Sequence, residues 1–422
     1  MRCRCPVYAY FWLATLAAYA GVILAAWRRR GAFYGRFAAI LLGVHTLISG
    51  ALAPHTGVLF PVYAALQAAL FAHFFFLSQP RMRPLAFRLF ISLPASFFAA
   101  GTLIAFPWAI VAAFGVRPLG LWIPYVIAGL GVIQSLTLRR EEVDLIIDRS
   151  PAGALARHAL PAMDGSPPDR DTTRPPLRFV QITDPHLGPF MSVARLRSIC
   201  ERAVAQDPDL VLLTGDFLTM ESQETHAHLE AALAPLRALP GRVFACHGNH
   251  DHEAPELVAR ALAAAGARLL VDDAVLVETR AGAVQIVGMD FNRARRAERM
   301  AAVCAAHPRI PGALRLVLLH DPGAFRELGE GEGDLVLSGH THGGQLGLVS
   351  LGLPHTMLRL FIDMPDHGLW ARGRDRLYVH RGTGHYGFPL RLGVPAEESL
   401  VRVHQVPSWE TPESVSRQTP AT

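Results

Sequence analysis

Long apolar segments at the N-terminal end restrict what this chain can fold into more than any other feature of its sequence. Inside a bilayer, every backbone N–H and C=O must be paired within its own segment, so apolar segments of about 20 residues form helices there. The sequence therefore predicts an all-α transmembrane bundle of about five helices over residues 1–140. The predicted spans are approximately Val7 to Trp27, Phe37 to Leu52, Val58 to Leu77, Phe90 to Phe114 and Leu121 to Leu138.

The first of these segments also has features of a cleavable signal peptide. Arg2 and Arg4 form a basic start, and Ala18-Tyr19-Ala20 could be a cleavage sequence. More apolar residues follow that sequence directly, and the run 28–30 of three arginines ends the segment as a topological anchor does. The prediction is an uncleaved span.

The arginines that flank the spans predict the orientation of the bundle. Basic residues concentrate on the cytoplasmic side of a membrane, and here they gather on one side of the predicted spans. An odd number of spans then places the N-terminus outside and everything after Arg140 in the cytoplasm, in a multi-pass protein of the inner (plasma) membrane. One helix more or fewer would reverse this orientation. The cytoplasmic set is Arg28, Arg29, Arg30, Arg36, Arg81, Arg83, Arg88, Arg139 and Arg140, against Arg2, Arg4 and Arg117.

Two histidines, His45 and His73, fall inside the predicted spans. Ionisable side chains within a bilayer often mark a polar pathway. The spans contain no Asp, Glu or Lys that could complete such a pathway. Both histidines are therefore predicted to face the interior of the helix bundle.

The sequence becomes polar after the spans. Residues 141–176, rich in Pro, Ala, Asp and Arg from Ser150 onward, are predicted to be a linker. Strand-like and amphipathic helix-like runs alternate over residues 177–406, which predicts a layered α/β domain, and residues 407–422 are predicted to be a disordered tail. The net charge of +5 comes with dispersed arginines rather than a basic groove with stacking aromatics, so no nucleic-acid partner is expected.

Five apolar, strand-like runs in this domain each end in residue types that bind metals. Ligands collect where the carboxyl ends of parallel strands meet. A single Asp, Asn or His at such a place is usually a turn or structural residue, but five in order form a pattern. The runs lead into Asp184-Pro185-His186, Gly215-Asp216, Gly248-Asn249-His250-Asp251, His320 and Gly339-His340-Thr341-His342.

The order DxH, GD, GNH[DE], H and GHxH resembles the calcineurin-like metallophosphoesterase superfamily. The N-terminal spans, the sequence GHTHGGQ from Gly339 to Gln345 and the later Arg381-Gly382-Thr383-Gly384 are similar to its membrane-anchored bacterial members. The resemblance implies a four-layer αββα sandwich after the helical bundle, with two metals at one edge. It also implies that Asp184, His186 and His342 hold one metal, that Asn249, His320 and His340 hold the other, that Asp216 bridges them, and that His250 stays free for catalysis.

The chemistry of these residue types agrees with that assignment. Imidazole and carboxylate ligands suit Mn, Fe and Zn ions, and the sequence does not choose among them. Two ions about 3.5–4 Å apart lower the pKa of a water molecule between them, so the leaving oxygen, rather than the nucleophile, needs help from the protein. His250 is placed to supply that proton. The predicted reaction is hydrolysis of a phosphate ester or a pyrophosphate.

One position departs from the family pattern. Many relatives have an Asp three residues after the bridging Asp, where it orients the catalytic histidine, but this chain has Thr219. Asp251 and Glu221 are both candidates for that role. Arg381 and Arg391 are predicted to pair with a second phosphate of the substrate.

An apolar segment from Leu346 to Trp370 follows the last motif. A loop this long and apolar is either a lid packed on the core or a lip turned toward lipid. Because five helices exceed what attachment requires, we expect a lipid-linked substrate with its chains along Leu358, Phe361 and Ile362.

Other functions remain open at this point. A membrane transporter or sensor could carry a metal-binding domain without turnover, although it would not need a free histidine beside the metals. A nuclease would need a basic groove. A UDP-diacylglucosamine-type pyrophosphatase is a further enzyme that fits the pattern.

Overall fold

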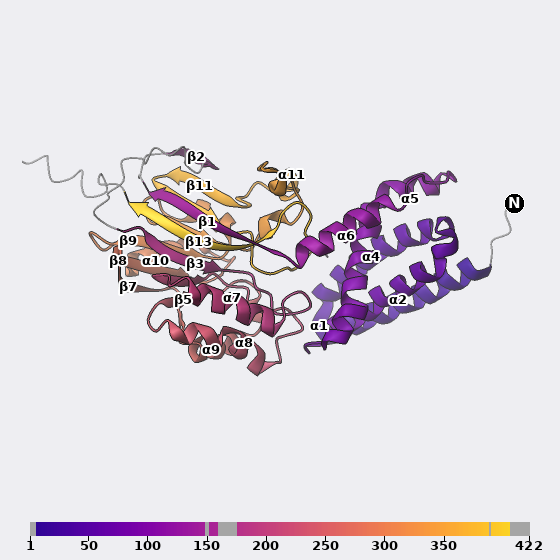
Figure 1. The fold of residues 1–422 in the computed structure, drawn as a ribbon, viewed down its shortest axis with the longest axis horizontal. Coiled ribbons are helices and arrows are strands. Elements are labelled where there is room, and N and C mark those ends of the chain that lie inside the picture. The colour runs from indigo at the N-terminus through magenta and orange to yellow at the C-terminus, as the bar shows by residue number, and fades with distance from the viewer. Residues whose placement is uncertain (1–5, 148–151, 159–174, 388–389, 406–422) are drawn as a thin grey trace, which may run out of the picture.

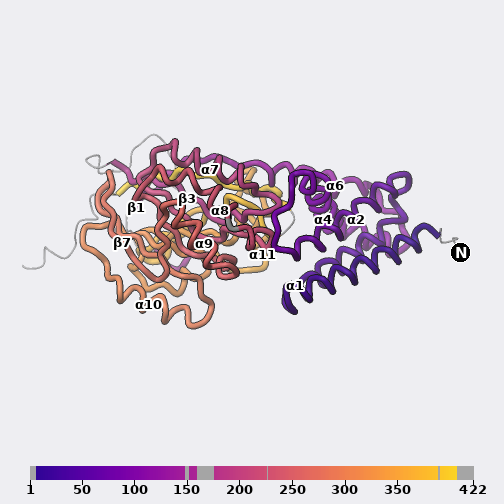
Figure 2. Tube along the Cα trace, turned by 90° about the horizontal axis from the view of Figure 1, so that it is seen from below, coloured from indigo at the N-terminus to yellow at the C-terminus, as the bar shows by residue number. Residues whose placement is uncertain are grey.

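A helical bundle and a two-sheet sandwich lie end to end in the computed structural model, which describes residues 6–147, 152–158, 175–387 and 390–405 (Figure 1). In a second view the first described residues again lie at the end of the bundle far from the sandwich (Figure 2). By length and composition, three helical segments of the described chain could cross a membrane: Pro6–His55, Gly57–Leu77 and Leu85–Ile104. The bundle helices are α1 (Pro6–Leu52), α2 (Phe60–Leu77), α3 (Leu85–Phe87), α4 (Leu93–Ile104), α5 (Phe106–Ala113) and α6 (Ile123–Ser135).

Helix α1 is an antiparallel pair of helices rather than one long helix. Gly31 has a φ of 83° and a ψ of −179°, which interrupts the helix directly after the three arginines. A Cβ added to Gly35 would lie 2.9 Å from the ring of Trp27, and one added to Gly50 would lie 1.9 Å from the ring of Trp12. A straight helix would hold Trp12 and Gly50 more than roughly 50 Å apart, so the chain reverses at Gly31. The two arms correspond to the first two predicted spans.

The last two predicted spans are shorter than expected. The span predicted to continue to Phe114 divides at Ala105 into α4 and α5, because Pro107 has no N–H to continue the helix. The last span ends at Ser135, since Leu138 already belongs to a strand. His45 and His73 are 2% and 8% exposed within the bundle, in agreement with their predicted position.

The sandwich consists of two sheets. The strand order is β1-β13-β3-β4-β5-β6 in the first sheet and β2-β11-β12-β10-β9-β8-β7 in the second. The first sheet contains β1 (Leu138–Ile147), β3 (Leu177–Ile182), β4 (Leu210–Leu213), β5 (Val243–Ala245), β6 (Arg268–Leu269) and β13 (Ala396–Gln405). The second contains β2 (Ala152–Arg157), β7 (Asp273–Thr279), β8 (Gly282–Met289), β9 (Leu314–Leu319), β10 (Leu335–Ser338), β11 (Gly368–Gly373) and β12 (Asp375–Val379).

Helices cover both outer faces of the sandwich. Alternate residues of β3 show the layering: Val180 and Ile182 pack with the helices, whereas Leu177 and Phe179 pack between the sheets. This arrangement confirms the predicted αββα architecture. Helices α7 (Val193–Ala205), α8 (His226–Leu233) and α9 (Pro255–Ala264) cover the first sheet, α10 (Arg296–Ala306) covers the second, and α11 (Leu358–Phe361) is a short turn in the apolar segment.

The predicted linker over residues 141–176 is wrong where the chain forms β1 and β2. Strand β1 pairs in parallel with β13 along its whole length. Val143, Leu145 and Ile147 are buried, while Asp144 between them faces outward and pairs with Arg402 of β13. The high charge of the segment concealed this alternation in the sequence. The remaining linker residues 148–151 and 159–174, and the predicted tail 407–422, lie outside the described residues.

Strand β1 begins directly after the last bundle helix, so the bundle and the sandwich are joined without a flexible connection. Only Leu136 and Thr137 separate α6 from β1. The backbone N–H of Arg391 donates to Ser135 Oγ at 2.7 Å. At the α1 reversal, Arg30 Nη2 donates to the Met220 carbonyl at 2.9 Å. The sandwich is therefore held to the bundle at two separate places.

Candidate metal centre

The fold brings the five motifs to one edge of the sandwich. Strands β3, β4 and β5 are parallel neighbours in the first sheet, and β9 and β10 are parallel neighbours in the second. Each predicted ligand follows the carboxyl end of one of these strands. Gln181, near the end of β3, donates to the Ser338 carbonyl at the end of β10 at 3.0 Å. The two sheets are thus joined at the edge where the motifs meet.

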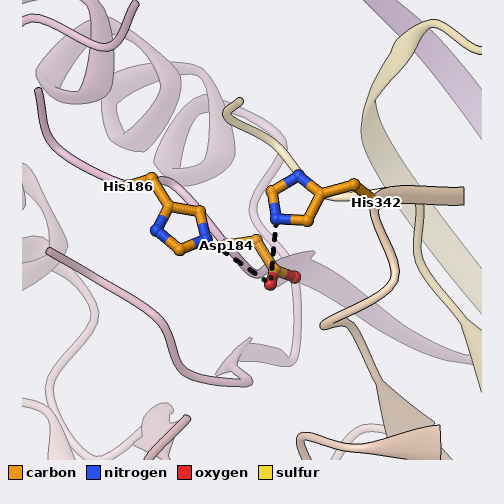
Figure 3. Close-up of side chains that lie close together, drawn as sticks. All are labelled: Asp184, His186 and His342. Carbon is orange, nitrogen blue, oxygen red and sulfur yellow. Dashed lines mark ion pairs between the residues drawn. The ribbon is translucent and has the colours of Figure 1, made fainter. Parts of the chain in front are cut away.

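Asp184, His186 and His342 form the first group of converging side chains (Figure 3). His342 Nε2 lies 3.5 Å from Asp184 Oδ1, and His186 Nε2 lies 3.9 Å from the same oxygen. All three side chains are buried, and one ligand atom of each lies within 4.8 Å of the other two. This group can surround a single cation.

Asp216, His320 and His340 form the second group, and Asp216 also reaches the first. Asp216 Oδ2 lies 3.2 Å from His320 Nε2 and 3.6 Å from His186 Nε2. His340 Nδ1 lies 3.3 Å from His320 Nε2. A carboxylate between two groups of nitrogen ligands has the position of a bridging ligand.

Unpaired polar atoms at this edge fit a metal centre. Asn249 Oδ1 and His186 Nε2 are buried without a hydrogen-bond partner among the described atoms. Such atoms cost free energy unless something binds them. His186 Nδ1 lies 3.2 Å from the Leu218 carbonyl and His320 Nδ1 lies 2.7 Å from the Thr214 carbonyl. Because carbonyls only accept, both Nδ1 atoms donate and both Nε2 atoms face the carboxylates, as in metal-binding histidines.

His342 is an exception to this pattern. Arg391 Nη2, which can only donate, lies 3.1 Å from His342 Nδ1. The ring proton of a neutral His342 is then on Nε2, the atom that faces Asp184. A cation at that nitrogen would require the contact with Arg391 to change.

Burial and neighbouring charge set the protonation of the centre. Burial lowers the pKa of His186 to about 3 and that of His340 to about 4, so both rings are neutral at pH 7. Burial also lowers the pKa of His320, but the charge of Asp216 outweighs this effect and raises it to about 10. Burial raises the pKa of Asp184 to about 6. A divalent cation would displace the His320 proton.

The backbone at the predicted ligands is unusual. Left-handed φ values in non-glycine residues cost roughly 1–3 kcal/mol each and persist where the surroundings enforce them. A Cβ on Gly248 would lie 2.2 Å from Asp216 Oδ1, so only glycine permits this close approach. Nine described residues other than glycine have positive φ, and five of them are predicted ligands: Asp184, His186, Asp216, His340 and His342.

Glu253, rather than Asp251 or Glu221, orients His250. His250 Nδ1 lies 2.7 Å from Glu253 Oε1. Asp251 instead accepts the backbone N–H groups of Asp216, Phe217 and Gly248 at 2.7–2.8 Å. Glu221 is buried, which raises its pKa to about 7, and it faces arginines of the bundle. This pair was not predicted from the sequence. The i,i+3 spacing of His250 and Glu253 across a short 3-10 turn is the sequence feature that could have indicated it.

The surroundings of His250 favour its protonated form. Burial alone would lower the pKa of His250, but the hydrogen bond with Glu253 and the charge of Asp216 raise it above the usual 6.5. The ring of Tyr386 lies 4.5 Å from the ring of His250 and stacks on His186, also at 4.5 Å. No motif in the sequence pointed to Tyr386.

The two arginines predicted to bind a second phosphate are already paired. Arg381 Nη2 lies 2.6 Å from Glu141 Oε1, and its Nε lies 3.3 Å from Glu397 Oε2. Arg391 is fully buried. This geometry disagrees with the predicted phosphate contacts, because both guanidinium groups already bind carboxylates or backbone carbonyls of the protein. Arg391 donates to the carbonyls of His342, Arg381 and Gly384 at 3.0, 2.8 and 2.8 Å.

A third group of metal-binding residue types lies nearby and was not predicted. His247 Nδ1 and His252 Nε2 lie 3.0 and 3.1 Å from Asp290 Oδ1. Arg299 Nη2 lies 3.3 Å from the other carboxylate oxygen of Asp290. This carboxylate therefore already has a cationic partner.

Known proteins with similar sequences support the same chemistry. A family model described as calcineurin-like phosphoesterase matches residues 177–344. Phosphodiesterase YaeI of Escherichia coli is 30% identical over 238 residues, which cover 54% of this chain and 82% of YaeI. UDP-2,3-diacylglucosamine pyrophosphatase LpxG of Chlamydia muridarum is 27% identical over 281 residues, covering 54% of this chain and 83% of LpxG.

A third relative bears on the membrane. A transmembrane protein with metallophosphoesterase domain from Danio rerio is 28% identical over 243 residues, which cover 54% of this chain and 53% of that protein. Together with the long apolar helices at the N-terminal end, this similarity indicates a membrane protein.

Proposed function

Because the chain belongs to the calcineurin-like phosphoesterase family of metal-dependent hydrolases, we propose that it is a membrane-bound phosphohydrolase that cleaves a lipid-linked phosphate ester or pyrophosphate. The observation that carries this proposal is Asp216, which lies between two groups of largely buried metal-binding residue types with His250 beside them. The names of YaeI and LpxG support phosphodiester or pyrophosphate chemistry, and that of LpxG supports a lipid-linked substrate.

In this proposal the chain holds two divalent ions. Asp216 is shared between them, and the imidazole and carboxylate donors suit Mn, Fe or Zn. When bound, the ions would lower the pKa of a water molecule and neutralise charge on the phosphate. The first ion is assigned to Asp184, His186 and His342, and the second to Asn249, His320 and His340.

His250 then serves as the proton donor for the leaving group. When the P–O bond breaks, its electron pair stays on the leaving oxygen, and a proton moves from His250 Nε2 to that oxygen. The oxygen of a water molecule that has released one proton to the solvent becomes bonded to phosphorus, and the solvent later returns a proton to His250. Glu253 accepts from Nδ1, which leaves Nε2 as the donor and stabilises the protonated ring.

Two variants separate metal binding from proton transfer. We expect Asp216→Asn to lower the metal content below two ions per chain. His250→Ala should keep both ions and lower kcat by about 10²–10⁴, the usual effect of losing a general acid. Metal content by mass spectrometry and release of phenol from phenyl methyl phosphate, whose leaving oxygen needs a proton at neutral pH, give the two readouts.

The control is His307→Ala, which removes a half-buried histidine outside all three groups of metal-binding residue types. We expect it to change neither readout by more than a few-fold. A His250→Ala protein with full metal content and near-normal turnover would exclude His250 from the mechanism. Stoichiometric metal binding without turnover in the unaltered protein would favour a binding module instead.

A further inference from the structure

A largely apolar cavity of about 420 Å³ lies between the helix bundle and the candidate metal centre. This volume falls within the range of roughly 300–1,000 Å³ that is typical of ligand pockets. Its bundle side is formed by the second arm of α1, by α2 and by α4. On α4 the lining residues Ala95, Ala99 and Leu103 follow one another at intervals of four, so a single helix face borders the cavity.

The other end of the cavity adjoins the candidate centre. Its lining includes His250 and Tyr386. The ring of Tyr386 stacks on that of His186 with their centroids 4.5 Å apart. A molecule in the cavity would therefore contact the proposed proton donor at one end while the rest of it lies among bundle helices.

The lining favours hydrocarbon over a charged ligand. Among the described residues that line the cavity, none is Asp, Glu, Lys or Arg, although Tyr34 and His45 have buried polar atoms without a hydrogen-bond partner among the described atoms. Burying a charged group of a ligand against such walls would leave it without a counter-ion, which costs free energy. Phe33 and Phe37 belong to the lining and are 83% and 51% exposed, so the cavity reaches the surface of the bundle beside them.

We propose that this cavity receives one hydrocarbon chain of a lipid phosphate whose phosphate group occupies the metal centre. The assignment rests on the proposed function. Because the walls on the bundle side come from membrane helices, the chain enters from the bilayer between helices without crossing water. Bilayer interior and cavity are similarly apolar, so this transfer costs little.

The cavity replaces the chain position expected from the sequence. Leu358, Phe361 and Ile362 are not among the described residues that line it. Phe361 is 77% exposed, and its neighbour Leu360 is 73% exposed. The apolar segment around α11 thus offers a competing location that an experiment can distinguish.

The first test uses two phosphodiesters that release the same group. p-Nitrophenyl methyl phosphate and p-nitrophenyl hexadecyl phosphate are compared on the full chain in detergent micelles. Leu41→Trp fills the cavity from α1, and Ile40→Trp adds the same ring to the adjacent, 70% exposed residue outside the lining. Partitioning into the micelle differs between the two esters but is the same for all variants, so it cancels when the ratio of the two kcat/KM values is compared between variants.

We expect the unaltered protein and Ile40→Trp to prefer the hexadecyl ester. Leu41→Trp should lower this preference about tenfold, the effect of losing contact with roughly two methylene groups, and should retain the rate on the methyl ester. Equal preference in Leu41→Trp and Ile40→Trp would overturn the cavity assignment. No hydrolysis of either ester would instead contradict the proposed function.

The second test does not depend on turnover. A hexadecyl phosphonate with a diazirine at the far end of its chain is photolysed with the full protein, and labelled peptides are mapped by mass spectrometry. Labels within 33–45, 70–77 and 95–103 are expected, with less labelling in Leu41→Trp than in Ile40→Trp. Labels mainly within 346–362 would overturn the assignment, since they would place the chain along the apolar segment.

Discussion

Glu253 and His250 form the pair that most directly links structure to reactivity at the scale of single residues. An acid catalyst must be protonated before the reaction, and the Glu253 carboxylate favours the protonated ring through a 2.7 Å hydrogen bond. Because this pair raises the pKa of His250, the active form is fully present below that pKa and is lost as pH rises through it. The pair thereby extends activity toward higher pH.

Glu253→Gln tests this role. The variant keeps a hydrogen-bonding group but removes the charge, so the pKa of His250 falls and the alkaline limb of the kcat/KM profile moves to lower pH. Metal content should stay unchanged, since Glu253 belongs to neither ligand group. An alkaline limb at the same pH as in the unaltered protein would show that the charge of Glu253 does not raise the pKa of His250.

Metal loading provides a second residue-scale prediction. His320 has a pKa of about 10 beside Asp216, so its proton is present at pH 7 and must leave when a cation binds. We expect proton release on loading and an apparent metal affinity that rises with pH. Calorimetric titration with Mn²⁺ in two buffers of different ionisation enthalpy measures the number of protons released. Identical heats in both buffers would contradict the prediction.

At the scale of elements, the strand ends were predictable from the sequence and the long-range contacts were not. Leu210 to Leu213 followed by Gly215-Asp216 is a local pattern of apolar residues and a turn, and the structure places it as predicted. The side-chain burial of β1 is also periodic, but Glu141, Glu142 and Asp144 made it resemble a polar linker.

Other features depend on segments that are far apart in the sequence. Tyr386 meets His186 only because the loop after β12 folds over the end of β3. The cavity forms only because the second arm of α1 packs near this loop. The side chains of Arg381 and Arg391 were available for a phosphate by sequence alone, and only tertiary contacts show that Glu141 and Glu397 already pair with Arg381. Contacts between distant segments leave no periodic pattern in the sequence, so the sequence alone could not predict them.

The junction of α6 and β1 carries an element-scale prediction. Inserting six residues of Gly and Ser after Leu136 would keep both elements but let the sandwich move relative to the bundle. We expect the ratio of hexadecyl to methyl ester hydrolysis to fall at least several-fold, while the methyl ester rate stays near that of the unaltered chain. The same insertion after Gly312, in the exposed turn before β9, serves as the control. An unchanged ratio after the Leu136 insertion would show that rigid attachment is not required.

For the whole molecule, the basic side of the bundle is the side that meets the sandwich. Arg30 at the α1 reversal donates to the Met220 carbonyl of the sandwich, and Arg29 Nη1 lies 3.1 Å from Ser78 Oγ at the end of α2. Arg83 follows at the same end, where its Nη2 donates to the Phe76 carbonyl at 2.8 Å. Basic residues of membrane proteins concentrate on the cytoplasmic side. We therefore propose that the metal centre faces the cytoplasm.

This orientation can be tested with two reporters in intact cells. A reporter fused after Thr422 should behave as cytoplasmic. One inserted at Gly57, in the turn between α1 and α2 at the other end of the bundle, should behave as external, because α2 returns the chain to the sandwich. The fluorescence of a fused green fluorescent protein and the activity of a fused alkaline phosphatase give opposite signals on the two sides, so each position is tested with both.

Protease added to intact cells should spare the sandwich and digest it only after lysis. An external signal after Thr422, or digestion without lysis, would reverse the orientation and would place the proposed lipid phosphate in the outer leaflet.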